Sequence, residues 1–451
     1  MAHVKNMTEG KPFPIIFAFF IPILCSSLFQ QMYSMVDTVI VGKGINDMAL
    51  AAVGATGAIT FFIFGFIGGL ASGMSVLMAQ SYGAGDYERL RKSITMGILS
   101  CGGIGILIMV VSLVAVRPVL ELLKTSEVIM DDAILYISII LLGIPLTLAY
   151  NCLGGILRAL GDSKTPLIAV IISSAINIVL DVVFVMVIHM GVAGAAIATL
   201  IAQLISGIFC LWRIKDIPYV KLKKSDWAVD NKNIGQQIKI GVPLAFMNSV
   251  TAVGCLLLQY FVNKLGVNYT AAYSACAKVT QFMMQPCTAV GVTINTYAGQ
   301  NLGAKKIDRI YQGIKSAGYI SVALAVITGV LLVFAPKQLI SLVLSDAENI
   351  GISVGYLKIC GYMMWSISFL FLIRSTSQGM GFTMIPMVSG FLELIARVVV
   401  VVALSDSMGF SAIALAEVSA WTAALALNTV YLWRKMRELK KTIPGGNEQT
   451  L

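Results

Sequence analysis

Two stretches of the chain, AQSYGAGDYERLRKSI at residues 79–94 and GQNLGAKKIDRIYQGI at residues 299–314, are copies of one pattern. They share a glutamine, a Gly-Ala pair and a later arginine in register, and they lie about 220 residues apart. Such a duplication predicts two halves built on the same plan. Other pairs share this offset: ALAAVGA (49–55) with YTAAYSA (269–275), TPLI (165–168) with IPMV (385–388), and Pro22 with Pro243.

The composition places both halves in a membrane. The chain has 451 residues, of which 58% are hydrophobic and 12% charged, and its mean hydropathy is +0.87. That leaves too little polar surface to coat a soluble globule of this size. The polar start MAHVKNMTEGKPFP indicates no removable signal peptide. Apolar stretches long enough to cross a bilayer as helices recur about twelve times, at 14–40, 47–80, 93–116, 133–157, 166–188, 192–213, 234–262, 269–300, 313–335, 353–379, 386–404 and 410–433.

The net charge of +10 is distributed on one side of this predicted membrane protein. Basic residues crowd the loops after the even-numbered spans, as in RIKDIPYVKLKKSDWAVDNKN (213–233), and are sparse in the opposite loops. The positive-inside rule therefore predicts that both termini are cytoplasmic, which agrees with an even number of spans. The same distribution argues against nucleic acid as a partner.

These observations predict an all-α integral membrane protein with twelve transmembrane helices in two six-helix bundles related by a pseudo-two-fold duplication. An even-span repeat returns to the same side, and transporters built this way hold substrate between their halves. The expected segments are an N-terminal bundle (1–212), a cytoplasmic linker (213–233), a C-terminal bundle (234–433) and a cytoplasmic tail (434–451).

The sequence resembles the multidrug and toxic compound extrusion (MATE) transporters over nearly its full length. The motifs that carry the resemblance are VDTVIVGKG, AQSYGAGDYERLRKSI, RALGDSKTP, NIVLD and GVAGAAIAT, with their echoes in the second half. The resemblance implies a V-shaped pair of bundles in the cell membrane, a monomer, which exports amphipathic, often cationic drugs or toxic compounds in exchange for protons or sodium ions. It implies no cofactor and no enzymatic reaction.

Spacing brings two intramembrane acids together. Asp181 and Thr199 each lie nine residues from the turn near Met190, so they face one another roughly 13 Å below that turn. Asn177 is on the same helix face as Asp181, one turn away. Asp37 precedes its own loop by about seven residues, at roughly 11 Å. We therefore expect Asp37, Asn177, Asp181 and Thr199 to form a coupling cluster.

Such a cluster suits either coupling ion. Two neighbouring buried acids resist both being ionised and tend to hold a proton. The same carboxylate, amide and hydroxyl oxygens are ligands for sodium, and no other metal is expected. The resemblance, closest to the DinF-like branch of the family, adds a coupling or cavity network of Gln30, Tyr33, Tyr136 and Asn151. Met32 belongs to a set of methionines that suit an adaptable binding surface, and Lys278 either lines the cavity or snorkels.

Simpler roles remain open for several of these residues. Asn177 and Thr199 are of types that commonly bridge membrane helices without binding an ion. Glu393 and Arg397 are four residues apart, which favours an intrahelical ion pair over a site. Pro22 interrupts the first span and either permits a functional bend or is a static kink.

Other function classes lack their motifs. The two histidines form no H-E-x-x-H, and no G-x-x-x-x-G-K-[ST] occurs. No repeated filter loop suggests a channel. The remaining alternative is a flippase for lipid-linked saccharides or other lipids on a related fold.

Overall fold

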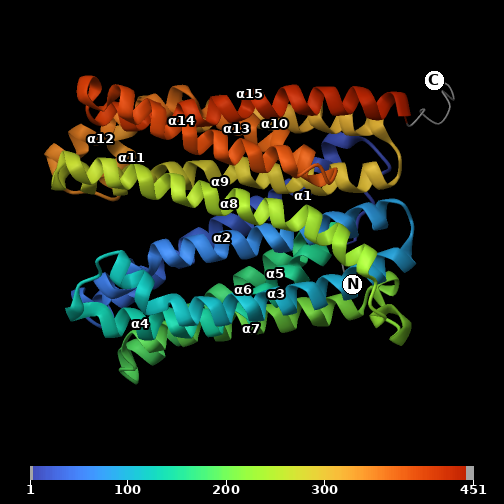
Figure 1. Cartoon of the computed structure of the whole chain (residues 1–451), viewed down its shortest axis with the longest axis horizontal. Coiled ribbons are helices and arrows are strands. Elements are labelled where there is room, and N and C mark those ends of the chain that lie inside the picture. The colour runs from blue at the N-terminus through green and yellow to red at the C-terminus, as the bar shows by residue number, and fades with distance from the viewer. Residues whose placement is uncertain (1–3, 443–451) are drawn as a thin grey trace. The chain divides into compact units, whose positions relative to one another are not determined.

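The computed structural model describes residues 4–442, apart from the side chains of Lys43, Asp47 and Ala58, and no strand occurs among them (Figure 1). The helices of the first half are α1 (Pro12–Gly44), α2 (Asp47–Gly83), α3 (Tyr87–Leu122), α4 (Glu127–Leu142), α5 (Ile144–Ala159), α6 (Lys164–Asp181), η1 (Val182–Val187) and α7 (Gly191–Lys215). The short helices η2 (Pro218–Val220) and η3 (Lys224–Trp227) follow. The second half contains α8 (Asn231–Leu265), α9 (Val267–Gly303), α10 (Ile307–Phe334), α11 (Pro336–Ser341), α12 (Ala347–Tyr362), α13 (Met364–Gly379), α14 (Met384–Met408) and α15 (Phe410–Thr442).

Each expected span coincides with one of these helices or with a bent helix pair. In the described residues, 9 helices are long and apolar enough to cross a membrane, and the pairs α4–α5 and α12–α13 raise this to 11. The twelfth expected span is α9, whose sequence is more polar. Its polar residues Thr293, Asn295 and Gln300 are buried within the protein, where neighbouring helices, instead of lipid, surround them.

The bent pairs occupy equivalent places in the two halves. The break at Gly143 bends α4–α5 by 44°, and the break at Met363 bends α12–α13 by 49°. At each break the carbonyl keeps a backbone partner: the Thr147 amide donates to Gly143 O at 3.0 Å, and the Ser366 amide donates to Met363 O at 2.9 Å. Ser366 Oγ also donates to Met363 O, at 2.8 Å.

Contacts divide the chain into two units. Among the described residues, unit 1 contains 4–6 and 25–245, and unit 2 contains 7–24 and 246–442. The borders at 24/25 and 245/246 fall inside α1 and α8, whereas the borders expected from the sequence, at 212/213 and 233/234, lie at the ends of expected spans. Each unit therefore includes part of a helix that the other unit continues.

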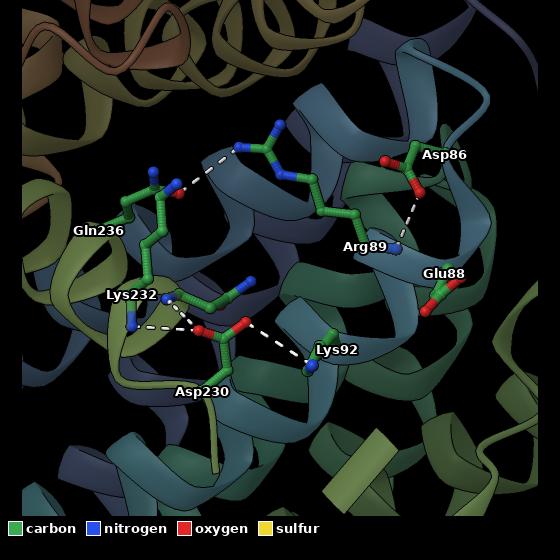
Figure 2. Close-up of a pocket in the computed structure, with 8 residues that line it drawn as sticks. Asp86, Glu88, Arg89, Lys92, Asp230, Lys232 and Gln236 are labelled. Atoms are coloured by element: carbon green, nitrogen blue, oxygen red, sulfur yellow. Dashed lines mark hydrogen bonds and ion pairs between the residues drawn. The ribbon is translucent and has the colours of Figure 1, made fainter. Parts of the chain in front are cut away.

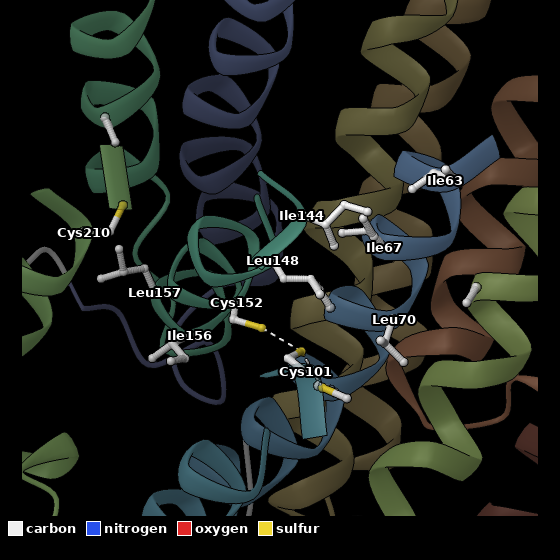
Figure 3. Close-up of a cluster of buried hydrophobic side chains, with 14 of the residues drawn as sticks. Ile63, Ile67, Leu70, Cys101, Ile144, Leu148, Cys152, Ile156, Leu157 and Cys210 are labelled. Carbon is white, nitrogen blue, oxygen red and sulfur yellow. Dashed lines mark hydrogen bonds between the residues drawn. The ribbon is translucent and has the colours of Figure 1, made fainter. Parts of the chain in front are cut away.

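The same helix pairs pack in both units, as the duplication predicts. In unit 1, α6 packs on α7 and α2 packs on α5; in unit 2, their counterparts α14 and α15 pack together, as do α9 and α13. The core of unit 1 contains Leu70, Ile144 and Leu148, and Cys101 lies beside Cys152 within it (Figure 3). The core of unit 2 is built around residues such as Leu357, Met364 and Trp421.

Candidate functional site

Asp37 and Asp181, the two acids of the expected coupling cluster, lie together in unit 1 because α1 packs on η1 and α7. Ile40 and Val41 of α1 are buried against Val185 of η1 and Ala195 of α7. Ile40 lies one turn after Asp37, and Val185 lies one turn after Asp181. The packing consequently brings the carboxyl groups of Asp37 and Asp181 within hydrogen-bonding reach of one another.

The expected members of the cluster differ in how deeply they are buried. Asp181 is fully buried, and Asn177 is 1% exposed on the same face of α6. Thr199 is half-buried on α7, the helix that packs on α6. Tyr33 and Tyr136 interact electrostatically with both carboxyl groups. The structure therefore gathers two acids and two tyrosines, with Asn177 one helical turn from Asp181.

Several buried polar atoms of this cluster lack a hydrogen-bond partner among the described residues. In the described part of the chain, Asp37 Oδ1, both carboxyl oxygens of Asp181, the side-chain amide atoms of Asn177 and Ser174 Oγ are buried without a hydrogen-bond partner. Two ionised carboxylates offer acceptors alone, so they bond to each other only when a proton lies between them. Burying such groups unpaired is costly. A proton or a cation would satisfy these oxygens, which are of the kind that a hard cation such as sodium takes.

The backbone changes directly after Asp181. The helix α6 ends at this residue and continues as the π-helix η1. Single π turns inside α-helices occur frequently at functional sites. The sequence analysis did not foresee this feature, because VVFVMV is an ordinary apolar run.

Residues expected from the family resemblance are placed as follows. The side chains of Gln30 and Met32 on α1 are exposed, so no other part of the described protein covers them. Asn151 Nδ2 donates to Thr147 O at 2.8 Å, and Thr147 Oγ1 donates to Gln203 Oε1 at 2.6 Å, which joins α5 to α7. The sequence analysis missed Thr147 and Gln203. Their spacing of four from Asn151 and Thr199, one helical turn, is the signal that identifies them.

Two further expected residues belong to unit 2. Pro22 is buried inside α1, two residues before the border at which α1 passes into unit 1. The side chain of Lys278 is exposed on α9.

Unit 2 contains a buried chain of charges. The intrahelical pair expected from the sequence is present, since Arg397 Nη1 lies 3.9 Å from Glu393 Oε2. It is part of a longer chain: Arg374 Nη1 lies 2.9 Å from Glu393 Oε1, and Arg397 Nη2 lies 3.0 Å from Glu417 Oε2. All four residues are at least nine-tenths buried. The sequence analysis missed Arg374 and Glu417, although a lone charge in a membrane segment is a signal for a partner.

A charged cleft opens beside the first turns of α3 and α8 in unit 1 (Figure 2). Its volume is about 500 Å³. Lys92 Nζ lies 3.8 Å from Asp230 Oδ2, and Arg89 Nη2 donates to Gln236 Oε1 at 3.4 Å. The lining contains both acidic and basic residues, so the cleft has no clear preference for the charge of a ligand. The lining residues are Asp86, Glu88, Arg89, Lys92, Asp230, Lys232, Asn233 and Gln236.

Comparison with known proteins matches both halves to one family. The MatE family model matches residues 22–183 and again residues 243–403. The probable multidrug resistance protein YoeA of Bacillus subtilis is 27% identical over 77% of this chain and 76% of its own length. The DNA damage-inducible protein F of Escherichia coli is 25% identical over 72% of this chain and 71% of its own length.

A solved structure has the same fold. A crystal structure of MATE in the bent conformation superposes with a TM-score of 0.90 at 20% identity, covering 97% of this chain and 98% of the other. The expected fold class is thereby confirmed, as is the resemblance that the sequence motifs carried.

Proposed function

Because this chain belongs to the MatE family, we propose that it is a secondary active exporter that exchanges protons or sodium ions for amphipathic, often cationic compounds. The observation that carries the proposal is the set of buried, unpartnered oxygens of Asp37, Asp181 and Asn177. The description of YoeA as a probable multidrug resistance protein supports drugs as the substrate class.

Coupling follows from the two forms of the cluster. With a proton between Asp37 and Asp181, one carboxyl donates to the other and the pair carries a single negative charge. When this proton is released, two negative charges face one another in a poorly solvated site. Their repulsion favours separation of α1 from α6 or entry of water. A sodium ion on the carboxylate and Asn177 amide oxygens would remove the same repulsion. The ion therefore biases the position of the α1 segment that carries Asp37.

Pro22 provides a place for α1 to respond. Proline cannot donate to the carbonyl of Ala18, and its ring crowds that turn, so the helix is easiest to bend there. Gln30 and Tyr33 lie between Pro22 and Asp37 on α1. We propose that a bend in this region changes the space available to substrate in the first half, with Gln30, Tyr33, Tyr136, Asn151 and Met32 as its lining or coupling residues. Lys278 remains a candidate lining residue of the second half.

The proposed setting is the cell membrane, with both termini and residues 213–233 on the cytoplasmic side. The proposed active form is a monomer, because each chain contains both halves of the duplication.

The test uses the purified chain in proteoliposomes, with imposed proton or sodium gradients and a fluorescent amphipathic cation such as ethidium as substrate. Asp37→Asn and Asp181→Asn should each slow gradient-driven export at least about tenfold, because each removes a releasable charge but keeps the shape. The matched control is Asp132→Asn, an exposed acid at the start of α4. Wild-type export by both aspartate variants would refute the coupling site. Movement of a fluorescent lipid in place of the cation would indicate a flippase.

A further inference from the structure

The repeated motif that divides the chain into halves has a structural role that ion coupling leaves unexplained. In the second copy, four polar side chains converge on the backbone of residues 7–10. We refer to residues 7–10 as the strap and to Gln300, Asn301, Lys306 and Arg309 as the cradle. The cradle residues lie at the end of α9 and at the start of α10.

Arg309 makes three of the six hydrogen bonds between cradle and strap. Its Nη1 donates to Gly10 O at 2.9 Å, and its Nη2 donates to Met7 O at 3.1 Å and to Glu9 O at 3.2 Å. Its Nε donates to Asn301 Oδ1 at 3.0 Å, which holds the guanidinium in place. A planar guanidinium with donors in a fixed fork suits such a cluster of carbonyls.

The other cradle residues complete the contact. Lys306 Nζ donates to Thr8 O at 2.9 Å, and Asn301 Nδ2 donates to Met7 O at 3.2 Å. The Met7 amide donates to Gln300 Oε1 at 2.9 Å. Every strap carbonyl from Met7 to Gly10 therefore accepts a bond from the cradle, and the strap's side chains contribute none of these bonds.

Two of the four cradle residues are fully buried, whereas Arg309 is half-buried and Lys306 is exposed. Gln300 and Asn301 are fully buried, and Met7 is 1% exposed. Tyr297 OH donates to Arg309 O at 3.1 Å. The Tyr297 ring lies so close to Gly313 that a Cβ there would be 2.2 Å from a ring carbon, so this motif glycine is needed for the ring's position.

The strap leads directly into α1, whose first part is held in the same unit. Ile16, Phe19 and Phe20 are buried with Ile294 of α9 and Ile320 of α10. Residues 7–24 thus form one anchored section of unit 2, which includes Pro22, and α1 leaves this section at residue 25.

The first copy of the motif also contacts the chain around the start of a shared helix, but through other positions: among the described residues, the side chain of its in-register arginine, Arg89, donates only to Gln236 Oε1, at 3.4 Å. Arg91 Nε donates to Asp226 Oδ2 at 3.1 Å, and Gln237 Nε2 donates to Ser93 O at 2.7 Å. Thr95 Oγ1 also donates to Asp226 O at 2.7 Å. Each copy therefore binds the chain segment that leads into a helix shared by the two units.

We propose that the cradle is a positioning site for transport: it fixes the start of α1, so that an ion-dependent change beyond Pro22 displaces the part that carries Asp37. This inference rests on the proposed export function. Without the cradle, the anchored section would move with the rest of α1, and ion binding would no longer be converted efficiently into substrate movement.

The test compares Arg309→Met with Arg434→Met in full-length protein. Methionine keeps roughly the aliphatic part of the side chain and removes all its donors, and Arg434 is an exposed arginine of α15. Strap release is measured by maleimide labelling of Thr8→Cys, a position only 4% exposed. We expect roughly tenfold faster labelling and roughly tenfold slower gradient-driven export for Arg309→Met, and wild-type values for Arg434→Met.

A third measurement separates positioning from a general loss of structure. A fluorophore on Met35→Cys, an exposed position near Asp37 on α1, reports the response to protons or sodium. This response should persist in Arg309→Met. If Arg309→Met does not fold, Lys306→Met, which removes one strap bond, takes its place. Wild-type export with a released strap would overturn the inference alone, whereas a wild-type protein without gradient-driven export would refute the proposed function itself.

Discussion

The buried charge chain of unit 2 makes a quantitative prediction. Arg374, Glu393, Arg397 and Glu417 carry two positive and two negative charges, so the chain is neutral as a whole. Glu417→Gln leaves one positive charge without compensation, and it weakens the bonds of 3.0 Å and 3.2 Å that Arg397 donates to Glu417 Oε2. Breaking a buried pair from one side costs about 3–5 kcal/mol.

The geometry places this variant at the lower end of that range. The glutamine carbonyl still accepts one bond from Arg397, and Glu393 remains within 3.9 Å of the guanidinium. We expect a loss of about 3 kcal/mol in the free energy of unfolding, roughly a hundredfold in the folded-to-unfolded ratio. Arg397→Met should cost a similar amount, because it leaves Glu417 buried without a partner.

The double variant Arg397→Met, Glu417→Leu distinguishes charge balance from packing. It leaves the neutral pair of Arg374 and Glu393, whose 2.9 Å contact is untouched. We expect it to lie within about 1 kcal/mol of the wild type, since apolar replacements of a buried pair are often neutral. The assay is reversible unfolding in detergent, or the temperature of half-maximal aggregation where unfolding is irreversible. Single variants that match the wild type, or a double variant that loses the sum of both, would refute this reasoning.

Three further predictions concern other parts of the chain. Pro22→Ala should keep expression and substrate binding but slow export and weaken its dependence on the ion gradient; unchanged rate and coupling in proteoliposomes would exclude a functional bend. Gly73→Ala should destabilise unit 1 by about 1–3 kcal/mol in thermal unfolding, because a Cβ there would lie 2.3 Å from Gly241 Cα, whereas the control Gly54→Ala meets nothing within 4 Å. Lys221→Cys should react with an impermeant maleimide only after cells are opened, and labelling of intact cells would reverse the assigned topology.

Much of the fold was predictable, since apolar length and a repeat offset are properties of the sequence itself. Counting residues from the turn near Met190 and back from the first loop predicted similar depths for Asp181 and Asp37, because helical rise is nearly constant, and the two side chains do lie close to one another. The π-helix after Asp181 and the unpartnered oxygens of Asn177 depend on packing between helices. Periodicity does not encode them.

The cradle and the charge chain could not be predicted from the sequence, for a related reason. Arg309 binds the backbone carbonyls of Met7, Glu9 and Gly10. Because any residue supplies a carbonyl, no sequence pattern at the strap indicates the contact. Arg374 and Glu417 were visible as single charges in apolar runs, but their partners lie on other helices. Only Glu393 and Arg397, four apart on one helix, could be paired from their spacing.

The division of α1 between the units affects how the protein is made. Residues 7–24 are synthesised well before Ile294, Ile320 and Leu372, against which they pack. At 5–20 residues per second, the roughly 350 residues that separate this section from Leu372 take roughly 20–70 s to synthesise. The start of α1 therefore completes its packing only after most of the second half has been made, and a nascent chain that stops after the first half contains a helix whose start has no partner.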